Sequence, residues 1–233
     1  MKSLFIISFI LINTCIFGNN DSIIFYDGFN SDLSNWVIEK ESDETNITLK
    51  DSILEISTPK GITLWFNKKL EGNIKISYYA YVVKDTGKYD RVSDLNCFWM
   101  ASDPLYPDYF FTRSEWRKGI FSRYYSCKLY YVGYGGNNNT TTRFRKYNGD
   151  FDAFSKNKNR PDIIKEYTDS SHLIIPNKWH FIEIIVNNNQ IQYYFNNKLL
   201  FDYYDENPYN SGYFGIRTTE NHLKIKKFVI SKL

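Results

Sequence analysis

Residues 179–204 have the sequence WHFIEIIVNNNQIQYYFNNKLLFDYY, and this passage decides the fold class. It contains three runs rich in β-branched and aromatic residues, which are the residue types that favour strands. Asparagines at 187–189 and 196–197 separate the runs, and asparagine tolerates the left-handed backbone of tight hairpin turns. Three strands joined by two turns form a meander, so the passage predicts an antiparallel sheet.

Neighbouring segments extend this pattern in both directions. Residues 212–217 and 223–231 predict two further strands, and residues 74–83 predict a longer one upstream. Along 74–83 apolar residues alternate with polar and aromatic ones, as in a strand with one buried face. Shorter strands are expected at 23–26, 47–49, 53–57 and 62–66. Helical periodicity is almost absent, so we expect an all-β fold in which two antiparallel sheets form a sandwich.

One short helix is expected within this sandwich. Residues 112–118 have the sequence TRSEWRK, in which Thr112 and Glu115 have the spacing of a capping box. Such a helix would cover a binding cleft as a lid.

Residues 1–18 predict an export signal, because Lys2 precedes an apolar run at 4–12 that is too short to span a bilayer. Residues 11–15, LINTC, form a weak lipobox, so Cys15 is a candidate for lipid attachment. Residues 19–233 then form a single domain, since no linker-like segment divides them. The mature protein is expected in the periplasm, outside the cell, or lipid-anchored at its surface.

The composition favours a binding protein that does not bind nucleic acid. A formal net charge of +3 over 233 residues is too small to indicate a nucleic-acid partner. Aromatic residues make up 18% of the chain, including 20 tyrosines, so many tyrosines are expected at the surface. We expect a monomer. In an exported protein Cys97 and Cys127 would form either a disulfide or two buried free thiols.

Residues 124–147, YYSCKLYYVGYGGNNNTTTRFRKY, are the best candidate for a functional site. Aromatic rings stack on sugar faces, amides bind sugar hydroxyls, and arginines bind carboxylate or sulfate. The alternative is a long hairpin with a solvated, asparagine-rich tip. The candidate side chains are Tyr131, Tyr134, Asn137, Asn139, Arg143 and Arg145.

A second group of candidates lies at 91–99, RVSDLNCFW. Arg91 would bind a uronate carboxylate, Asp94 and Asn96 would line the wall of a cleft, and Trp99 would be a stacking platform. The alternative is an ion pair between Arg91 and Asp94 beside a core tryptophan. His172 is a candidate proton acceptor, with a structural role as its alternative.

Several segments resemble known proteins. Residues 25–36 (FYDGFNSDLSNW), 177–205 and 211–230 are similar to concanavalin-like jelly rolls of secreted bacterial carbohydrate-active proteins. Residues 91–104 (RVSDLNCFWMASDP) and 133–147 (GYGGNNNTTTRFRKY) resemble, more narrowly, an uncharacterised family in that group. The resemblance implies a jelly roll that acts on a polysaccharide or oligosaccharide, but it does not specify the chemistry.

Three functions from different classes stay open. The working hypothesis is a polysaccharide lyase, in which Arg91, Arg143 or Arg145 neutralises a uronate carboxylate while a tyrosine or histidine transfers the proton. The proton-transfer candidates are Tyr131, Tyr134 and His172. The second function is a carbohydrate-binding module or lectin without catalysis.

The third function is a glycoside hydrolase, which needs two suitably separated carboxylates. Asp94, Glu115 and Glu166 are available, but the ExDxE-type strand usual in hydrolases of this fold is missing. No zinc-binding spacing connects the histidines or cysteines, and His222 is expected to be solvated in a turn. We expect no cofactor and no catalytic metal, although the resemblance allows a structural calcium ion.

Overall fold

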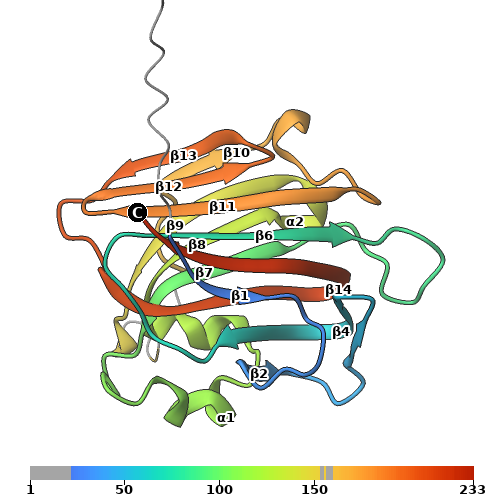
Figure 1. Ribbon diagram of the computed structural model, residues 1–233, viewed down its shortest axis with the longest axis horizontal. Coiled ribbons are helices and arrows are strands. Elements are labelled where there is room, and N and C mark those ends of the chain that lie inside the picture. Colours follow the sequence, from blue (N-terminus) through green and yellow to red (C-terminus); the bar gives the residue numbers. More distant parts are fainter. Residues whose placement is uncertain (1–21, 153–154, 156–159) are drawn as a thin grey trace, which may run out of the picture.

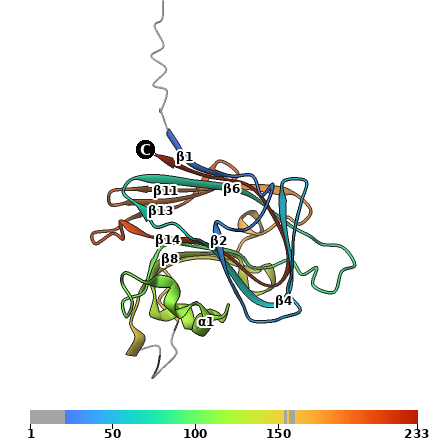
Figure 2. The same ribbon diagram turned by 60° about the horizontal axis from the view of Figure 1, so that its bottom comes forward.

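The computed structural model describes residues 22–152, 155 and 160–233. The expected export signal at 1–18, including Cys15, lies outside these residues. The described chain forms two facing β layers, with short helices on the outer side of one of them (Figures 1 and 2). None of the helices in these ranges is long and apolar enough to cross a membrane.

β14 (Ser211–Lys232) connects the two layers, because its first part pairs with β7 and its last part with β6. The first layer also contains β7 (Leu95–Ser102), β8 (Lys128–Gly135), β9 (Thr141–Asn148) and β10 (Lys165–Tyr167). The second layer contains β6 (Ile74–Val82), β11 (Trp179–Asn187), β12 (Gln190–Phe195) and β13 (Lys198–Tyr204). β1 (Ser22–Asp27), β2 (Trp36–Lys40), β3 (Asn46–Lys50), β4 (Ile53–Phe66) and β5 (Leu70–Glu71) complete the sandwich.

The structure confirms the all-β, two-layer antiparallel sandwich and the meander at its C-terminal end. β11, β12 and β13 pair in sequence order. Asn188, Asn196 and Asn197 have φ values of 51°, 52° and 63°, which is the left-handed backbone expected of these turns.

Two pairs of expected strands are in fact single bent strands. Residues 53–57 and 62–66 both belong to β4, and residues 212–217 and 223–231 both belong to β14. Irregular register between Thr219 and Asn221 and between Lys226 and Val229 lets β14 bend while it keeps its partners. His222 therefore lies within a strand, and its ring nitrogens contact Asp90 and Glu55 at 2.8 and 2.6 Å. The expectation of a solvated turn at His222 is wrong.

The space between the layers is filled by alternate residues of the facing strands. On β6, Ile74, Ile76, Tyr78, Ala80 and Val82 are all buried, as their alternation predicts. The two thiols are buried and free: Cys97 belongs to this core and Cys127 to a second cluster on the other side of the first layer.

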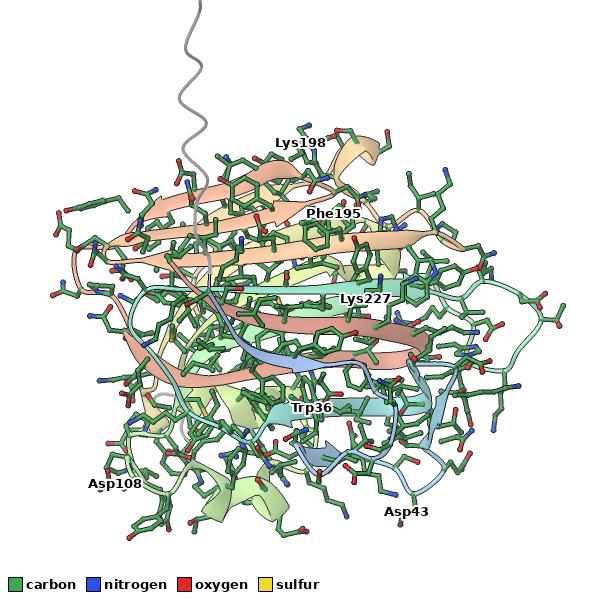
Figure 3. All side chains as sticks on the ribbon, in the orientation of Figure 1. Trp36, Asp43, Asp108, Phe195, Lys198 and Lys227 are labelled. Atoms are coloured by element: carbon green, nitrogen blue, oxygen red, sulfur yellow. The ribbon has the colours of Figure 1, made fainter. Side chains whose placement is uncertain are left out.

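That second cluster lies under residues 103–127, which we call the lobe. The lobe contains η1 (Phe110–Arg113), α1 (Ser114–Arg117) and η2 (Phe121–Ser126). Figure 3 shows that Asp108 in the lobe and Lys198 on β13 lie at opposite ends of the molecule. The short helix expected at 112–118 is confirmed, but its capping box is not, because α1 begins after Arg113 without a side-chain cap.

A buried arginine holds the lobe against the first layer. The Arg117 side chain is fully buried, its Nε donates to Glu39 Oε1 at 2.9 Å, and its Nη1 lies 3.6 Å from Asp103 Oδ2. Its guanidinium also lies 4.1 Å from the centre of the Phe110 ring. Because Glu39 belongs to β2, this contact ties the lobe to the edge of the sheet.

Candidate functional site

A pocket of about 210 Å³ opens beside the lobe, on the outer face of the first layer. It is rich in polar and charged side chains. The lining residues are Glu41, Asp94, Asn96, Phe121, Tyr131, Gly133, Gly136, Asn137, Thr141, Arg143, Arg145, Arg160, Arg217 and Thr219.

The floor of the pocket is a single row of residues that crosses four strands. Arg143 on β9 is opposite Gly133 on β8, Gly133 is opposite Asn96 on β7, and Asn96 is opposite Arg217 on β14. Directly opposed residues of antiparallel strands face the same side of a sheet. Strand pairing therefore brings residues from distant parts of the sequence onto one surface.

Tyr131 lies in the next row, and its hydroxyl extends over Gly133. A Cβ atom on Gly133 would lie 2.3 Å from that hydroxyl oxygen, so the absence of a side chain leaves room for the phenol. The ring packs against Phe98 and Phe121, with centroids 5.4 Å away in each case. Within the described ranges the Tyr131 hydroxyl has no hydrogen-bond partner.

Burial raises the pKa of Tyr131, and the negative charge of Asp94 raises it further, whereas Arg160, Arg217 and Arg145 oppose the shift. The phenol is therefore protonated at neutral pH. Its hydroxyl can therefore donate a hydrogen bond to a ligand in the pocket.

Four arginines, Arg143, Arg145, Arg160 and Arg217, line the same pocket as this phenol. Arg143 pairs with Glu166, but no carboxylate pairs with Arg145, Arg160 or Arg217 in the part of the chain that the structure describes. Arg160 and Arg217 both contact the Phe121 ring, at 5.0 and 4.8 Å from its centroid. The local charge is thus positive although the charge of the whole chain is small.

Arg145 and Asn96 each have a buried polar atom without a partner. The Arg145 side chain is 6% exposed and donates through Nη1 to the Pro161 carbonyl, while its Nε has no acceptor in the described chain. Burial lowers the pKa of Arg145, and the charges of Arg160 and Arg143 add to this shift. Asn96 is 3% exposed, and its Oδ1 has no donor among the same residues. Buried polar atoms are normally satisfied, so these two indicate a place for a ligand.

Two carboxylates also line the pocket. Asp94 Oδ2 accepts hydrogen bonds from Arg91 Nη2 and Ser93 Oγ, both at 2.6 Å, and its φ of 58° is left-handed. Glu41 Oε2 accepts from the Gly61 amide at 3.3 Å. Backbone strain of the kind seen at Asp94 recurs at functional sites.

The structure brings part of the predicted site together. Asp94, Asn96, Tyr131, Asn137, Arg143 and Arg145 line the pocket. Arg91 lies outside the lining, and its 2.6 Å bond to Asp94 is the ion pair that the alternative interpretation expected.

Trp99 and Tyr134 face the interior of the sandwich, so their assignments as stacking platform and catalytic residue are wrong. Trp99 has no exposed surface and stacks on Tyr130 at 5.6 Å. Tyr134 stacks on Phe195 at 3.8 Å. Each of them is three positions from a pocket residue, Asn96 and Tyr131 respectively, and strand alternation turns such a residue to the opposite face.

His172 and Asn139 do not line the pocket. His172 Nδ1 contacts Asp169 Oδ2 at 2.8 Å, and its ring stacks on Tyr167 at 3.9 Å. Asn139 forms hydrogen bonds with both the amide and the carbonyl of Ile174, which fix the turn α2 (Gly136–Asn139). The contacts of His172 with Asp169 and Tyr167, and those of Asn139 with Ile174, give each residue a structural role.

Among the charged and aromatic residues of the lining, sequence reasoning missed Glu41, Phe121, Arg160 and Arg217. Arg217 had a usable signal, because it alternates with the buried Ile216 on a strand and must face outward. The others lie in loops or short helices, where no periodicity indicates direction. Among the described residues no group of three or more His, Cys, Asp or Glu side chains is placed to hold a metal ion.

The sequence from 56 to 228 matches the family described as a domain of unknown function, DUF6250. The chain belongs to the DUF6250 family. The matched residues include every residue that lines the pocket except Glu41, which precedes residue 56. No curated protein matches the chain.

Solved structures share the fold of the DUF6250 domain at low sequence identity. A Bacillus subtilis protein of unknown function with a galectin-like fold has a TM-score of 0.71 at 13% identity, covering 91% of this chain and 96% of that one. A laminarinase from a Flavobacterium species has a TM-score of 0.59 at 12% identity, covering 91% and 100%. The carbohydrate-binding module CBM66 from Bacillus subtilis has a TM-score of 0.53 at 12% identity, covering 85% and 96%. These similarities establish the jelly-roll fold.

Proposed function

We propose that this domain binds an acidic sugar residue of a glycan in the pocket beside the lobe. The observation that carries the proposal is the group of three arginines, Arg145, Arg160 and Arg217, that have no carboxylate partner among the described residues and surround one small pocket. Arg145 and Arg217 are buried, whereas Arg160 is exposed. Buried cations are normally paired, so the two buried guanidinium groups favour an anion in the pocket.

The other lining atoms suit a sugar better than a simple anion. Arginine binds carboxylate with strong, directional hydrogen bonds. The unpaired Asn96 Oδ1 can accept a hydrogen bond from a sugar hydroxyl, and the Tyr131 hydroxyl can donate one. A ligand with one carboxylate and several hydroxyls would satisfy all three kinds of group.

The structural neighbours support this proposal at the level of the fold. Their names include a laminarinase and a carbohydrate-binding module, so jelly rolls of this shape accommodate glycans. An export signal at residues 1–18 would place the domain where such glycans occur, and both export and monomeric state remain predictions.

Binding to matched polysaccharides tests the proposal. The protein should be retarded in affinity electrophoresis by a uronate polysaccharide and much less by the same polymer after its carboxylates are reduced to alcohols. Arg145→Gln should weaken binding to the acidic polymer about ten- to a hundredfold, since a hydrogen bond to a charged group contributes roughly 1.5–3 kcal/mol. Arg123→Gln removes the same charge outside the pocket lining and is the control. Equal retardation by the two polymers would contradict the proposal.

A second candidate function is β-elimination, and the Tyr131 phenol favours it. In this reaction a base removes the proton at C5 of the uronate, the C4–O4 bond breaks, a C4–C5 double bond forms, and the leaving oxygen takes up a proton. The arginines would neutralise the carboxylate and so acidify C5. The protonated Tyr131 can supply the proton to the leaving oxygen, whereas its use as the base requires the phenolate.

Ultraviolet absorbance of an unsaturated uronate would detect this elimination. Because the pKa of Tyr131 is raised, a phenolate base would make the rate increase about tenfold for each pH unit above neutrality. Tyr131→Phe should abolish the reaction, and Tyr134→Phe, on the same strand but facing the interior, should not. A rate that is independent of pH in this range would exclude Tyr131 as the base.

Hydrolysis is the remaining alternative, and it now has different candidates. Asp94 and Glu41 are the carboxylates that line the pocket. Glu115 lies in another depression, with Glu39 and Lys118, and Glu166 pairs with Arg143, so the earlier grouping of Asp94, Glu115 and Glu166 is not assembled. New reducing ends without ultraviolet absorbance would identify a hydrolase.

A further inference from the structure

Gly119 closes the pocket on the side of β4. The Gly119 carbonyl accepts a hydrogen bond from Arg217 Nη1 at 2.8 Å. A Cβ atom on Gly119 would lie 2.5 Å from the Gly61 carbonyl oxygen and 2.8 Å from the Glu39 carbonyl oxygen. The backbone of the lobe therefore lies directly on β4 and β2, and no space for a ligand continues between them.

The rings of the lobe close a second side. Phe98 and Trp65 belong to the row of the sheet that follows the pocket floor, and neither has exposed surface. Tyr124 lies 5.2 Å from Phe98, and Phe110 lies 4.9 Å from Trp65, measured between ring centroids. The lobe thus covers the part of the sheet along which a long ligand would otherwise extend.

Arg91 closes a third side. Its guanidinium donates to Asp94 at 2.6 Å, to Asn138 Oδ1 at 2.6 Å and to the Thr219 carbonyl at 2.8 Å. Asp94 and Thr219 both line the pocket. The Arg91 side chain therefore connects β14, the segment before β7 and the turn α2 by hydrogen bonds, and these three segments form one side of the pocket.

The space between these three sides is small for a polymer. Its volume of about 210 Å³ is below the roughly 300–1,000 Å³ of pockets that bury drug-sized ligands. A space of this size suits a single sugar ring. We infer that the pocket receives the terminal residue of an acidic glycan chain and excludes residues in its interior. This inference rests on the proposed binding of an acidic sugar.

A series of oligosaccharides of increasing length tests the inference. Isothermal titration calorimetry would use galacturonate oligomers from the dimer to the polymer, with parallel glucuronate and mannuronate series. We expect one bound protein per glycan chain at every length, so that binding sites per sugar unit fall in inverse proportion to length. If the number of protein molecules bound per glycan chain instead increases in proportion to chain length, the inference is overturned and the proposed function is left intact. No binding in any series would instead contradict the proposed function.

Blocked chain ends provide the second measurement. One set of oligomers has its reducing end reduced to an alditol, and another has its non-reducing residue made unsaturated. Loss of binding, at least tenfold, in one of the two sets supports terminal recognition and identifies the end. If neither set binds more weakly than the unmodified oligomers, terminal recognition is overturned.

Discussion

Gly133 determines where the Tyr131 phenol can lie. The two residues are on the same strand and face the same side, two positions apart. Because Gly133 has no Cβ, the phenol can extend over the pocket floor rather than into solvent. The presence of a hydroxyl in the pocket thus depends on two positions together.

Replacement of Gly133 by alanine tests this dependence. The new Cβ would lie 2.3 Å from the phenol oxygen and 2.8 Å from the ring carbon that carries it, so the tyrosine must move. Overpacking of this kind costs about 1–3 kcal/mol of the free energy of unfolding. We expect Gly133→Ala to lower stability by that amount in urea denaturation, and to have little effect in a Tyr131→Ala background. An equal cost in both backgrounds would show that the contact with Tyr131 is not the cause.

Residue alternation explains which candidates could be found from the sequence. Arg143 and Arg145 are two apart on one strand, so alternation places both on one face, and both line the pocket. Applying the same rule to Tyr131 and Tyr134 would have separated them, because they are three apart. The positions of Arg160 and Glu41 depend on loop paths, which no local pattern determines.

At the scale of elements, the lobe turns an open sheet face into a pocket. Its attachment depends on Arg117, which is fully buried between Glu39 and Asp103. Burial alone would lower the pKa of Arg117, but the charge and hydrogen bond of Glu39, together with Cys127 and Tyr124, outweigh it, so the pKa of Arg117 is raised. The sequence predicted the helix, whereas its docking could not be predicted, because Glu39 and Arg117 are far apart in the chain.

Removal of the Arg117 charge should release the lobe. Arg117→Met would leave the buried Glu39 without a compensating cation, whereas Asp103 would keep its ion pair with Arg113. Breaking a buried pair in this way costs about 3–5 kcal/mol. We expect a loss of that size in the free energy of unfolding from urea titration. Lys118→Met removes a neighbouring, exposed charge, and its effect should stay within about 0.5 kcal/mol. Similar losses in the two variants would argue against the ion pair as the anchor.

At the scale of the whole molecule, β4 and β14 make the two layers one unit. β14 pairs with β7 in the first layer and with β6 in the second, and β4 pairs with β14 along most of its length. Figure 2 shows β4 curving between the two layers. The sequence predicted the individual strands but not their continuity, because Pro59-Lys60-Gly61 is typical of a turn and here lies within one bent strand.

Shared strands predict that the layers unfold together. Neither layer can separate without breaking the pairing of β14, so the described domain should show a single cooperative transition. Trp36 and Trp99 lie in the core between the layers, and Trp65 lies in the cluster under the lobe, so tryptophan fluorescence reports on both regions. We expect fluorescence and far-ultraviolet circular dichroism to give coincident urea transitions. An earlier fluorescence change that disappears in Trp65→Phe would show that the lobe and its cluster unfold separately, and the pocket would then be a structure that forms and opens independently of the sandwich.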